Sequence, residues 1–170
     1  MYLKPPGLAR TKSAFYAIIP NTCCLWMGTS LAEAAKRVPK GVVCLVSALA
    51  FHGLTDQLPR QIWLAIGQKD WAPKSDGTPI HIVRFTENLL NDSVETHVVE
   101  GVTVKVFGVV KTIADCFRYR NKIGLSVAIE GLQEALRQRK ATPGEIARQA
   151  ERGGVATVIR PYIEALTANG

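Results

Sequence analysis

Residues 111–124 read Lys-Thr-Ile-Ala-Asp-Cys-Phe-Arg-Tyr-Arg-Asn-Lys-Ile-Gly and hold the densest ordered polar chemistry in the chain. Charged and amide side chains alternate there with apolar and aromatic ones in one short helix and its exit. A planar guanidinium beside an aromatic ring can grip a phosphate or carboxylate and stack on the ring at once. We therefore expect a binding edge made of Lys111, Asp115, Arg118, Tyr119, Arg120, Asn121 and Lys122.

The spacing within this helix separates a packing face from a polar remainder. Positions i, i+3, i+4 and i+7 predict one face that packs on a sheet, and they hold Ile113, Cys116, Phe117 and Arg120. On the remaining surface Asp115 can pair with Lys111 or with Arg118. The ordinary alternative for each of these residues is a surface ion-pair ladder, which contributes about 0.2–0.5 kcal/mol per pair.

A second basic group follows further along the chain. Between positions 111 and 160 there are ten Lys or Arg and five Asp or Glu, so this third holds most of the net charge of +7. Cations near a helix C-terminus favour the helix dipole, which accounts for Arg137, Arg139 and Lys140 but accounts less well for Arg160. We add Arg137, Arg139 and Arg160 to the candidate binding residues.

Composition and charge narrow the class of protein. The chain has 170 residues, of which 47% are hydrophobic and 21% charged, as in one soluble globular domain. Its positive charge favours anionic partners such as nucleic acid or an acidic protein face. Four cysteines and three histidines follow no metal-ligand spacing, so we expect no metal, no disulfide and a reducing cytoplasm. No segment reaches the roughly 18 apolar residues of a membrane span, so we expect no membrane association.

We expect the chain to begin with an irregular segment over residues 1–28 and to form one domain over residues 29–170. Ser30 and Glu33 match a capping box and predict a helix over residues 31–38. The apolar run 42–54 predicts a buried helix that ends at a glycine cap, Gly53.

The middle of the chain is rich in strand signals and the last third in helix signals. Strands are expected at 61–67 and 80–85, with a hairpin of 94–99 and 102–107 around a turn at Glu100 and Gly101. Helices are expected at 109–119, 125–139, from 143 to the glycines at 153 and 154, and 155–166. The predicted class is α+β, with a small mixed or antiparallel sheet flanked by helices and a helical C-terminal third.

The sequence does not support a catalytic reading. A metal-dependent nuclease of the two-acid-plus-lysine type needs an acid two places before a strand lysine, but Lys105 has Thr103 there. Asp92 and Glu95 are expected in the preceding loop without a partner. No phosphate-cradling glycine loop and no Gly-x-Ser-x-Gly motif occurs. Ser47 and His52 are interpreted as a core serine and a capping histidine. We therefore predict no enzyme activity and no cofactor.

Four separated motifs, at residues 39–54, 59–66, 95–97 and 111–124, together resemble the AbiEi family of antitoxins of bacterial type IV toxin–antitoxin systems. The resemblance covers about residues 29–167. It implies a design in which an N-terminal winged helix-turn-helix binds the operon's promoter and a C-terminal domain is required for antitoxin function. It also implies a nucleotidyltransferase-like toxin as the functional partner, countered without a stable complex.

Residues 1–28 are too short for a winged helix-turn-helix, which needs about 60 residues with three helices. The expectation is therefore the antitoxin domain alone: a cytoplasmic, non-catalytic component of an abortive infection system. It would act through its basic helical face on nucleic acid that the toxin modifies, or on the toxin. The alternatives are a DNA-binding transcriptional regulator and a degenerate nuclease-like domain that retains only nucleic-acid binding.

Overall fold

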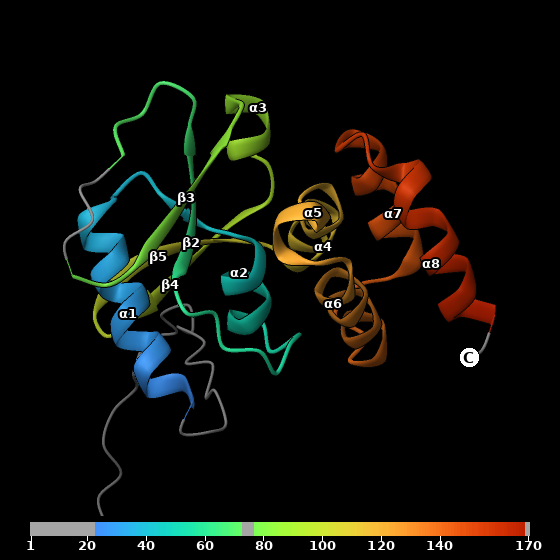
Figure 1. Ribbon diagram of the computed structural model, residues 1–170, viewed down its shortest axis with the longest axis horizontal. Coiled ribbons are helices and arrows are strands. Elements are labelled where there is room, and N and C mark those ends of the chain that lie inside the picture. The colour runs from blue at the N-terminus through green and yellow to red at the C-terminus, as the bar shows by residue number, and fades with distance from the viewer. Residues whose placement is uncertain (1–22, 73–76, 169–170) are drawn as a thin grey trace, which may run out of the picture.

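Five strands form one mixed sheet in the computed structural model, which describes residues 23–72 and 77–168 (Figure 1). The spatial order is β3-β2-β1-β5-β4. Two neighbouring pairs, β1–β2 and β4–β5, are antiparallel, and two, β1–β5 and β2–β3, are parallel. The strands are β1 Val42–Val43, β2 Ile62–Gly67, β3 Ile80–Phe85, β4 Val94–Val99 and β5 Val102–Phe107.

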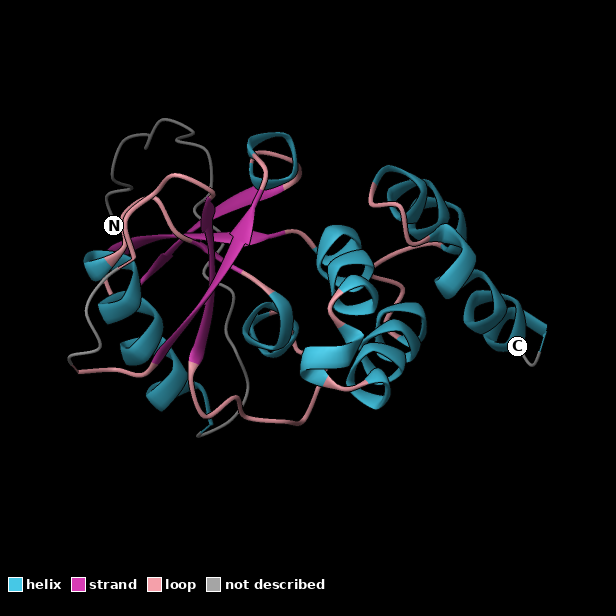
Figure 2. Ribbon diagram, turned by 45° about the horizontal axis from the view of Figure 1, so that its top comes forward, coloured by secondary structure: helices cyan, strands magenta, loops and turns pink. Residues whose placement is uncertain are grey.

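Helices cover both faces of this sheet, which confirms the predicted α+β class. The first helix lies on one face, and the C-terminal helices gather beyond the other face (Figures 1 and 2). Within the described residues the helices are α1 Cys23–Arg37, α2 Leu45–Phe51, α3 Glu87–Leu90, α4 Val109–Arg118, α5 Arg120–Ile123, α6 Leu125–Arg137, α7 Pro143–Arg152 and α8 Ala156–Ala168. None of them is long and apolar enough to cross a bilayer.

The predicted hairpin is confirmed with the expected ends. Glu100 and Gly101 both have positive φ, at 50° and 75°, as a two-residue type I′ turn requires. On β5 the valines Val104 and Val106 are buried while Thr103 and Lys105 are exposed, so the alternation follows the sequence pattern.

The sequence predicted one helix over the apolar run 42–54, and this prediction is wrong, because the run divides into a strand and a helix. Its first two residues form β1, the central strand, which lies between β2 and β5. Leu45 then takes a positive φ of 49°, and the chain turns into α2. The hydroxyl of Ser47 accepts a hydrogen bond from the Trp63 amide at 2.9 Å, which supplies a partner to β2 just beyond the end of β1. A two-residue buried strand has no periodicity that a sequence pattern could reveal.

The predicted glycine cap at Gly53 is confirmed. Gly53 has φ +65°, and the amide of Leu54 donates to the carbonyl of Leu49 at 2.8 Å. The amide of Gly53 itself donates to the carbonyl of Ala50 at 3.1 Å. These two bonds are those of a Schellman motif.

The first helix begins earlier than the capping pattern indicated. It starts at Cys23, so Ser30 lies inside α1 and is buried, and the predicted capping box is wrong. Glu33 instead accepts hydrogen bonds from the amide and hydroxyl of Thr78, in the segment before β3. Gly28 costs a helix only about 1 kcal/mol, which does not stop it. Of the predicted irregular segment, residues 1–22 lie outside the described residues.

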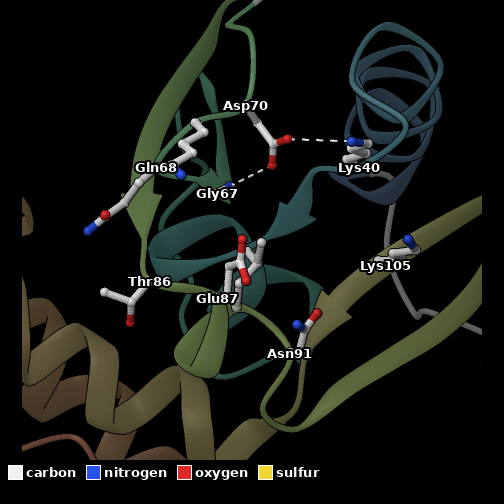
Figure 3. Close-up of a pocket in the computed structure, with 10 residues that line it drawn as sticks. Lys40, Gly67, Gln68, Asp70, Thr86, Glu87, Asn91 and Lys105 are labelled. Atoms are coloured by element: carbon white, nitrogen blue, oxygen red, sulfur yellow. Dashed lines mark hydrogen bonds and ion pairs between the residues drawn. The ribbon is translucent and has the colours of Figure 1, made fainter.

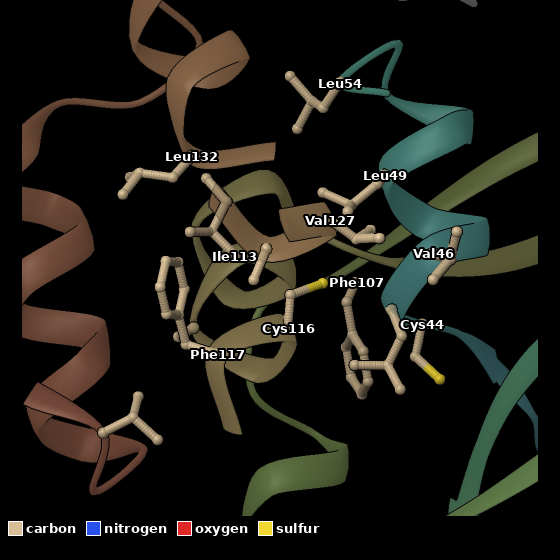
Figure 4. Packing of buried hydrophobic residues seen from close by; sticks show 14 of the residues in the cluster. Cys44, Val46, Leu49, Leu54, Phe107, Ile113, Cys116, Phe117, Val127 and Leu132 are labelled. Carbon is tan, nitrogen blue, oxygen red and sulfur yellow. The ribbon is translucent and has the colours of Figure 1, made fainter. Parts of the chain in front are cut away.

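Two apolar cores lie on the two faces of the sheet. Beneath α1, residues such as Leu31, Ala34 and Val38 pack on Leu64 and Val106. The larger core joins the other face to α2, α4 and the helices that follow. Figure 4 shows α4 at its centre, where Ile113 and Cys116 point among residues from α2 and α6, while the Phe117 ring lies 5.5 Å from the Tyr162 ring of α8. All three are fully buried, as predicted for a packing face, but they pack among helices rather than on the sheet.

Candidate functional site

The helix that carries the candidate residues is enclosed on every side. Residues 111–117 of α4 are all buried, because α2, α6, α7 and α8 surround the helix. Lys111 and Asp115 are only 1% and 2% exposed, so the prediction that they belong to a binding edge is wrong. Their predicted pairing is present, with 2.6 Å between Lys111 Nζ and Asp115 Oδ2.

The buried pair sits among aromatic rings. The Lys111 ammonium lies 5.2 Å from the centroid of Phe85 and 5.0 Å from that of Phe107, within the range of a cation–π contact. Burial raises the pKa of the Asp115 carboxyl above its ordinary value, while the Lys111 charge opposes that rise. Two opposite charges held in the core stabilise each other, and neither can reach a partner molecule.

Arg118 and Arg120 are used at helix ends. The Arg118 guanidinium donates to the carbonyl of Gly153, the C-cap of α7, and Arg120 Nη1 donates to the Phe117 carbonyl at 3.0 Å. Both carbonyls belong to the last turns of helices, where no intrahelical donor remains. Both half-buried guanidinium groups therefore stabilise helix ends, and a partner molecule that bound them would compete with these carbonyls.

Solvent exposure increases along the residues that follow α4. The Tyr119 ring packs 5.5 Å from Phe85, and burial raises the pKa of its phenol. Asn121 and Lys122 on α5 are exposed, and the Lys122 ammonium lies 5.6 Å from the Tyr119 ring. Of the predicted edge, α5 is thus the part open to solvent.

Two members of the second predicted group, Arg137 and Arg139, lie at the C-terminal end of α6, a helix about 18 Å long. Arg137 pairs with Glu134 through two hydrogen bonds, and these bonds lower the pKa of Glu134 to about 2. Arg139 is exposed and has φ +54°. It occupies the position after the C-cap, where the Lys140 amide reaches the carbonyl of Ala135 at 3.0 Å.

Arg160 is exposed on α8, and Arg148 and Arg152 are exposed on α7. Within the described residues, the side chains of Arg139, Arg152 and Arg160 make no hydrogen bond or ion pair. We call the exposed, solvent-facing set the helical cations and define it as Lys122, Arg139, Arg148, Arg152 and Arg160.

Charge divides unevenly between the two parts of the fold. Positions 23–108 hold eight Lys or Arg and eight Asp or Glu, so their charges cancel. Positions 109–168, from α4 to α8, hold ten Lys or Arg against six Asp or Glu, an excess of four. The helical part is therefore the basic part of the described structure, as the sequence indicated.

A polar pocket of about 420 Å³ was not predicted. It is formed by residues from the start of β1, the ends of β2 and β3, and β5, as Figure 3 shows. Polar residues follow both β2 and β3 in the sequence, namely 68–70 and 86–87. They converge because these two strands are parallel, and the sequence did not reveal that pairing.

The acids considered for a nuclease have partners. Asp92 accepts a hydrogen bond from the Gln149 amide of α7, and Glu95, which lies on β4 rather than in a loop, pairs with His97 at 3.2 Å. The predicted absence of partners is therefore wrong. Among the described residues no group of three or more His, Cys, Asp or Glu could hold a metal ion.

The other two polar residues lie where the sequence indicated. Ser47 is fully buried in the core, and His52 occupies the C-cap of α2. The His52 Nε2 atom lies 2.8 Å from the carbonyl oxygen of Phe107.

Comparisons with known proteins add no assignment, since no family model matches the chain and no curated protein matches it either. The functional argument therefore depends on the geometry and charge of the site.

Proposed function

We propose that this chain is a non-catalytic antitoxin of the AbiEi kind, which contacts an anionic partner through the helical cations. The observation that supports this is the uneven charge. An excess of four positive charges lies in α4–α8, and Arg139, Arg152 and Arg160 are exposed there without a partner among the described residues. Unpaired surface cations that outnumber acids create a positive field, which attracts polyanions.

Arg139 adds a second line of support. It holds a left-handed backbone at the C-terminus of α6, a position that glycine fills at Gly53 and Gly154 after α2 and α7. A non-glycine residue in this conformation costs about 1–2 kcal/mol. A charged side chain at a position that is cheaper for glycine is consistent with a role for the charge itself.

The partner we favour is RNA, because its successive phosphate groups can each bind one of several dispersed cations, which need not form one pocket. Each phosphate contact releases counterions, so binding weakens steeply with salt. The cations are spread over α5, the end of α6, α7 and α8, as an extended polyanion would require. The toxin or operator DNA are the other outcomes that the test must separate.

The test compares two variants with the same change in charge. Arg152→Gln/Arg160→Gln removes two helical cations, and Lys36→Gln/Arg60→Gln removes two exposed cations from the sheet part. Binding to tRNA and to duplex DNA is measured by fluorescence anisotropy at several salt concentrations. We expect the first variant to lower the salt slope by about 1 per lost contact and the second to leave it unchanged.

Antitoxin function is scored as growth rescue when the chain is co-expressed with a nucleotidyltransferase-like toxin encoded beside it. Rescue by the wild type and by Lys36→Gln/Arg60→Gln, with loss in Arg152→Gln/Arg160→Gln, supports the proposal. Equal rescue by both variants would remove the helical cations from the mechanism. Failure of the wild type to rescue would refute the antitoxin role, and preference for operator DNA over tRNA would favour a transcriptional regulator.

A further inference from the structure

The polar pocket at the end of β2 and β3 is built from four segments that are distant in the sequence. Lys40 precedes β1, residues 67–70 end and follow β2, residues 86, 87, 90 and 91 follow β3, and Lys105 lies on β5. Its volume of about 420 Å³ exceeds what one ion or water needs and falls in the range of small-molecule sites, roughly 300–1,000 Å³. The helical cations do not line it, so the inference below is independent of the proposed function.

One wall of the pocket is held rigid without any ligand. Arg84 Nη1 donates to three carbonyls of the turn after β2, those of Gly67 at 3.2 Å, Gln68 at 2.7 Å and Asp70 at 3.0 Å. Asp70 Oδ2 accepts from the Gly67 amide at 3.0 Å. A Cβ atom on Gly67 would lie 2.7 Å from that same oxygen, so a larger residue there would displace the Asp70 carboxylate. A pre-ordered wall spares a ligand the cost of ordering it.

The side chains of the pocket combine two kinds of chemistry. Lys40, Lys69 and Lys105 supply ammonium groups, and Lys40 lies 3.5 Å from Asp70 Oδ1. Asp70 and Glu87 supply carboxylates, and Figure 3 shows Lys40 and Lys105 on the same side of them. Ammonium groups bind phosphate, and carboxylate oxygens accept hydrogen bonds from hydroxyl groups.

The composition of the lining excludes several ligand classes. Among the described residues that line it, Leu90 is the one large apolar side chain and none is aromatic, so they offer nothing on which a flat apolar molecule could stack. A simple cation would be repelled by the lysines, and a simple anion would be repelled by the two carboxylates. A ligand with one anionic group and several hydroxyl groups can bind the lysines through the anionic group and the carboxylates through the hydroxyl groups.

We propose that this pocket binds a phosphorylated sugar. The phosphate faces Lys40 and Lys105, and the sugar hydroxyls donate to Asp70 and Glu87. Asn91 lies beside them with an amide that can both donate and accept. The same chemistry occurs in a free sugar phosphate and in the phosphorylated end of an RNA strand, and the experiment distinguishes these two sources.

The test measures binding to the full chain by isothermal titration calorimetry with ribose 5-phosphate, ribose and inorganic phosphate. We expect ribose 5-phosphate to bind at least about tenfold more tightly than either half. Lys105→Gln should weaken ribose 5-phosphate about tenfold or more, since it removes a charged contact. Glu87→Gln should weaken ribose 5-phosphate, because an amide oxygen accepts hydrogen bonds from hydroxyl groups less strongly than a carboxylate does. It should not weaken inorganic phosphate, because it removes a charge that repels phosphate.

Matched controls separate the pocket from general charge. Lys36→Gln and Glu100→Gln make the same changes in charge at exposed positions outside the pocket and should leave binding unchanged. All these positions are exposed, and circular dichroism of each variant checks that it is folded. A short RNA with and without a 5′ phosphate identifies the source: tighter binding of the phosphorylated than of the unphosphorylated RNA, with the difference lost in Lys105→Gln, assigns the strand end.

Three results would overturn the proposal. The first is no saturable binding of ribose 5-phosphate up to about 10 mM, a concentration at which even a weak site would fill. The second is equal affinity for inorganic phosphate, which would make the pocket a simple anion site. The third is binding that a folded Lys105→Gln variant retains in full.

Discussion

The ion pair between Lys111 and Asp115 makes the stability of this protein dependent on two charges that no solvent reaches. At 2.6 Å their attraction is about 6 kcal/mol for an effective dielectric constant of about 20. Most of this attraction offsets the cost of removing both charges from water, so the net value of the pair is small. Removing one partner is different, because the remaining charge keeps its burial cost. We expect Lys111→Met to lower the free energy of unfolding by about 3–5 kcal/mol at neutral pH.

The pH dependence of this loss can be derived from Asp115. Burial raises the pKa of its carboxyl in the folded state, and Lys111 is the main influence that lowers it. The unfolded chain therefore releases this proton first as the pH rises from about 4, and stability falls until the folded pKa is passed. Without Lys111 the folded pKa rises further and the fall continues to higher pH. The gap between wild type and Lys111→Met should thus be smaller at about pH 5 than at about pH 8.

Urea unfolding followed by circular dichroism measures both effects. With a slope of about 2 kcal/mol per molar urea, the expected loss moves the midpoint by about 2 M at neutral pH. The double variant Lys111→Met/Asp115→Leu is the control, because it removes both charges at similar volume and should recover most of the stability. A midpoint for Lys111→Met within about 0.5 M of wild type would refute the reasoning. So would a double variant as unstable as the single one.

Further outcomes follow from other contacts. Burial lowers the pKa of His52, which lies near Glu95, His97 and Lys140. The unfolded state therefore binds a proton first as the pH falls, and the free energy of unfolding should decrease below about pH 6.5. His52→Gln should flatten this part of a profile of urea midpoint against pH. Arg139→Gly should raise the free energy of unfolding by about 1 kcal/mol while weakening tRNA binding, and an unchanged anisotropy titration would contradict the role given to its charge. Gly131→Ala should destabilise by about 1–3 kcal/mol, since its Cβ would lie 2.8 Å from Leu49 Cδ2 in the core. Gly144→Ala, with nothing within 4 Å, should instead stabilise the same fold in thermal unfolding.

Sequence patterns predicted the elements whose two faces differ. The hairpin β4–β5 and strand β3 have the predicted ends because alternation and turn residues mark them. The patterns failed for β1, which is buried on both faces and only two residues long. They also failed at α4, because an amphipathic pattern implies a solvent face and this helix has none. Its polar residues face each other in the core, which only the packing of its neighbours determines.

The candidate site shows the same division. The sequence indicated that the last third is basic, and counting charges was enough for that. It could not reveal that Arg118 and Arg120 bind helix-end carbonyls, since both contacts depend on where α7 and the end of α4 lie. The polar pocket was beyond prediction for a related reason: its four segments share no local motif, and they meet only through the parallel pairing of β2 and β3.

The way in which α8 packs on the other helices affects its local opening. Ile159 is its one fully buried residue, and Pro161 within it lacks the amide that would complete the helical ladder. Its other core contacts come from partly buried side chains, such as Tyr162, Ile163 and Leu166, and a helix held in this way opens locally at a free energy below that of global unfolding. Its amides should therefore exchange with solvent first, and Arg160 should sample many positions. A bound polyanion would narrow that range, so hydrogen exchange in α8 should slow on binding even if no other helix moves.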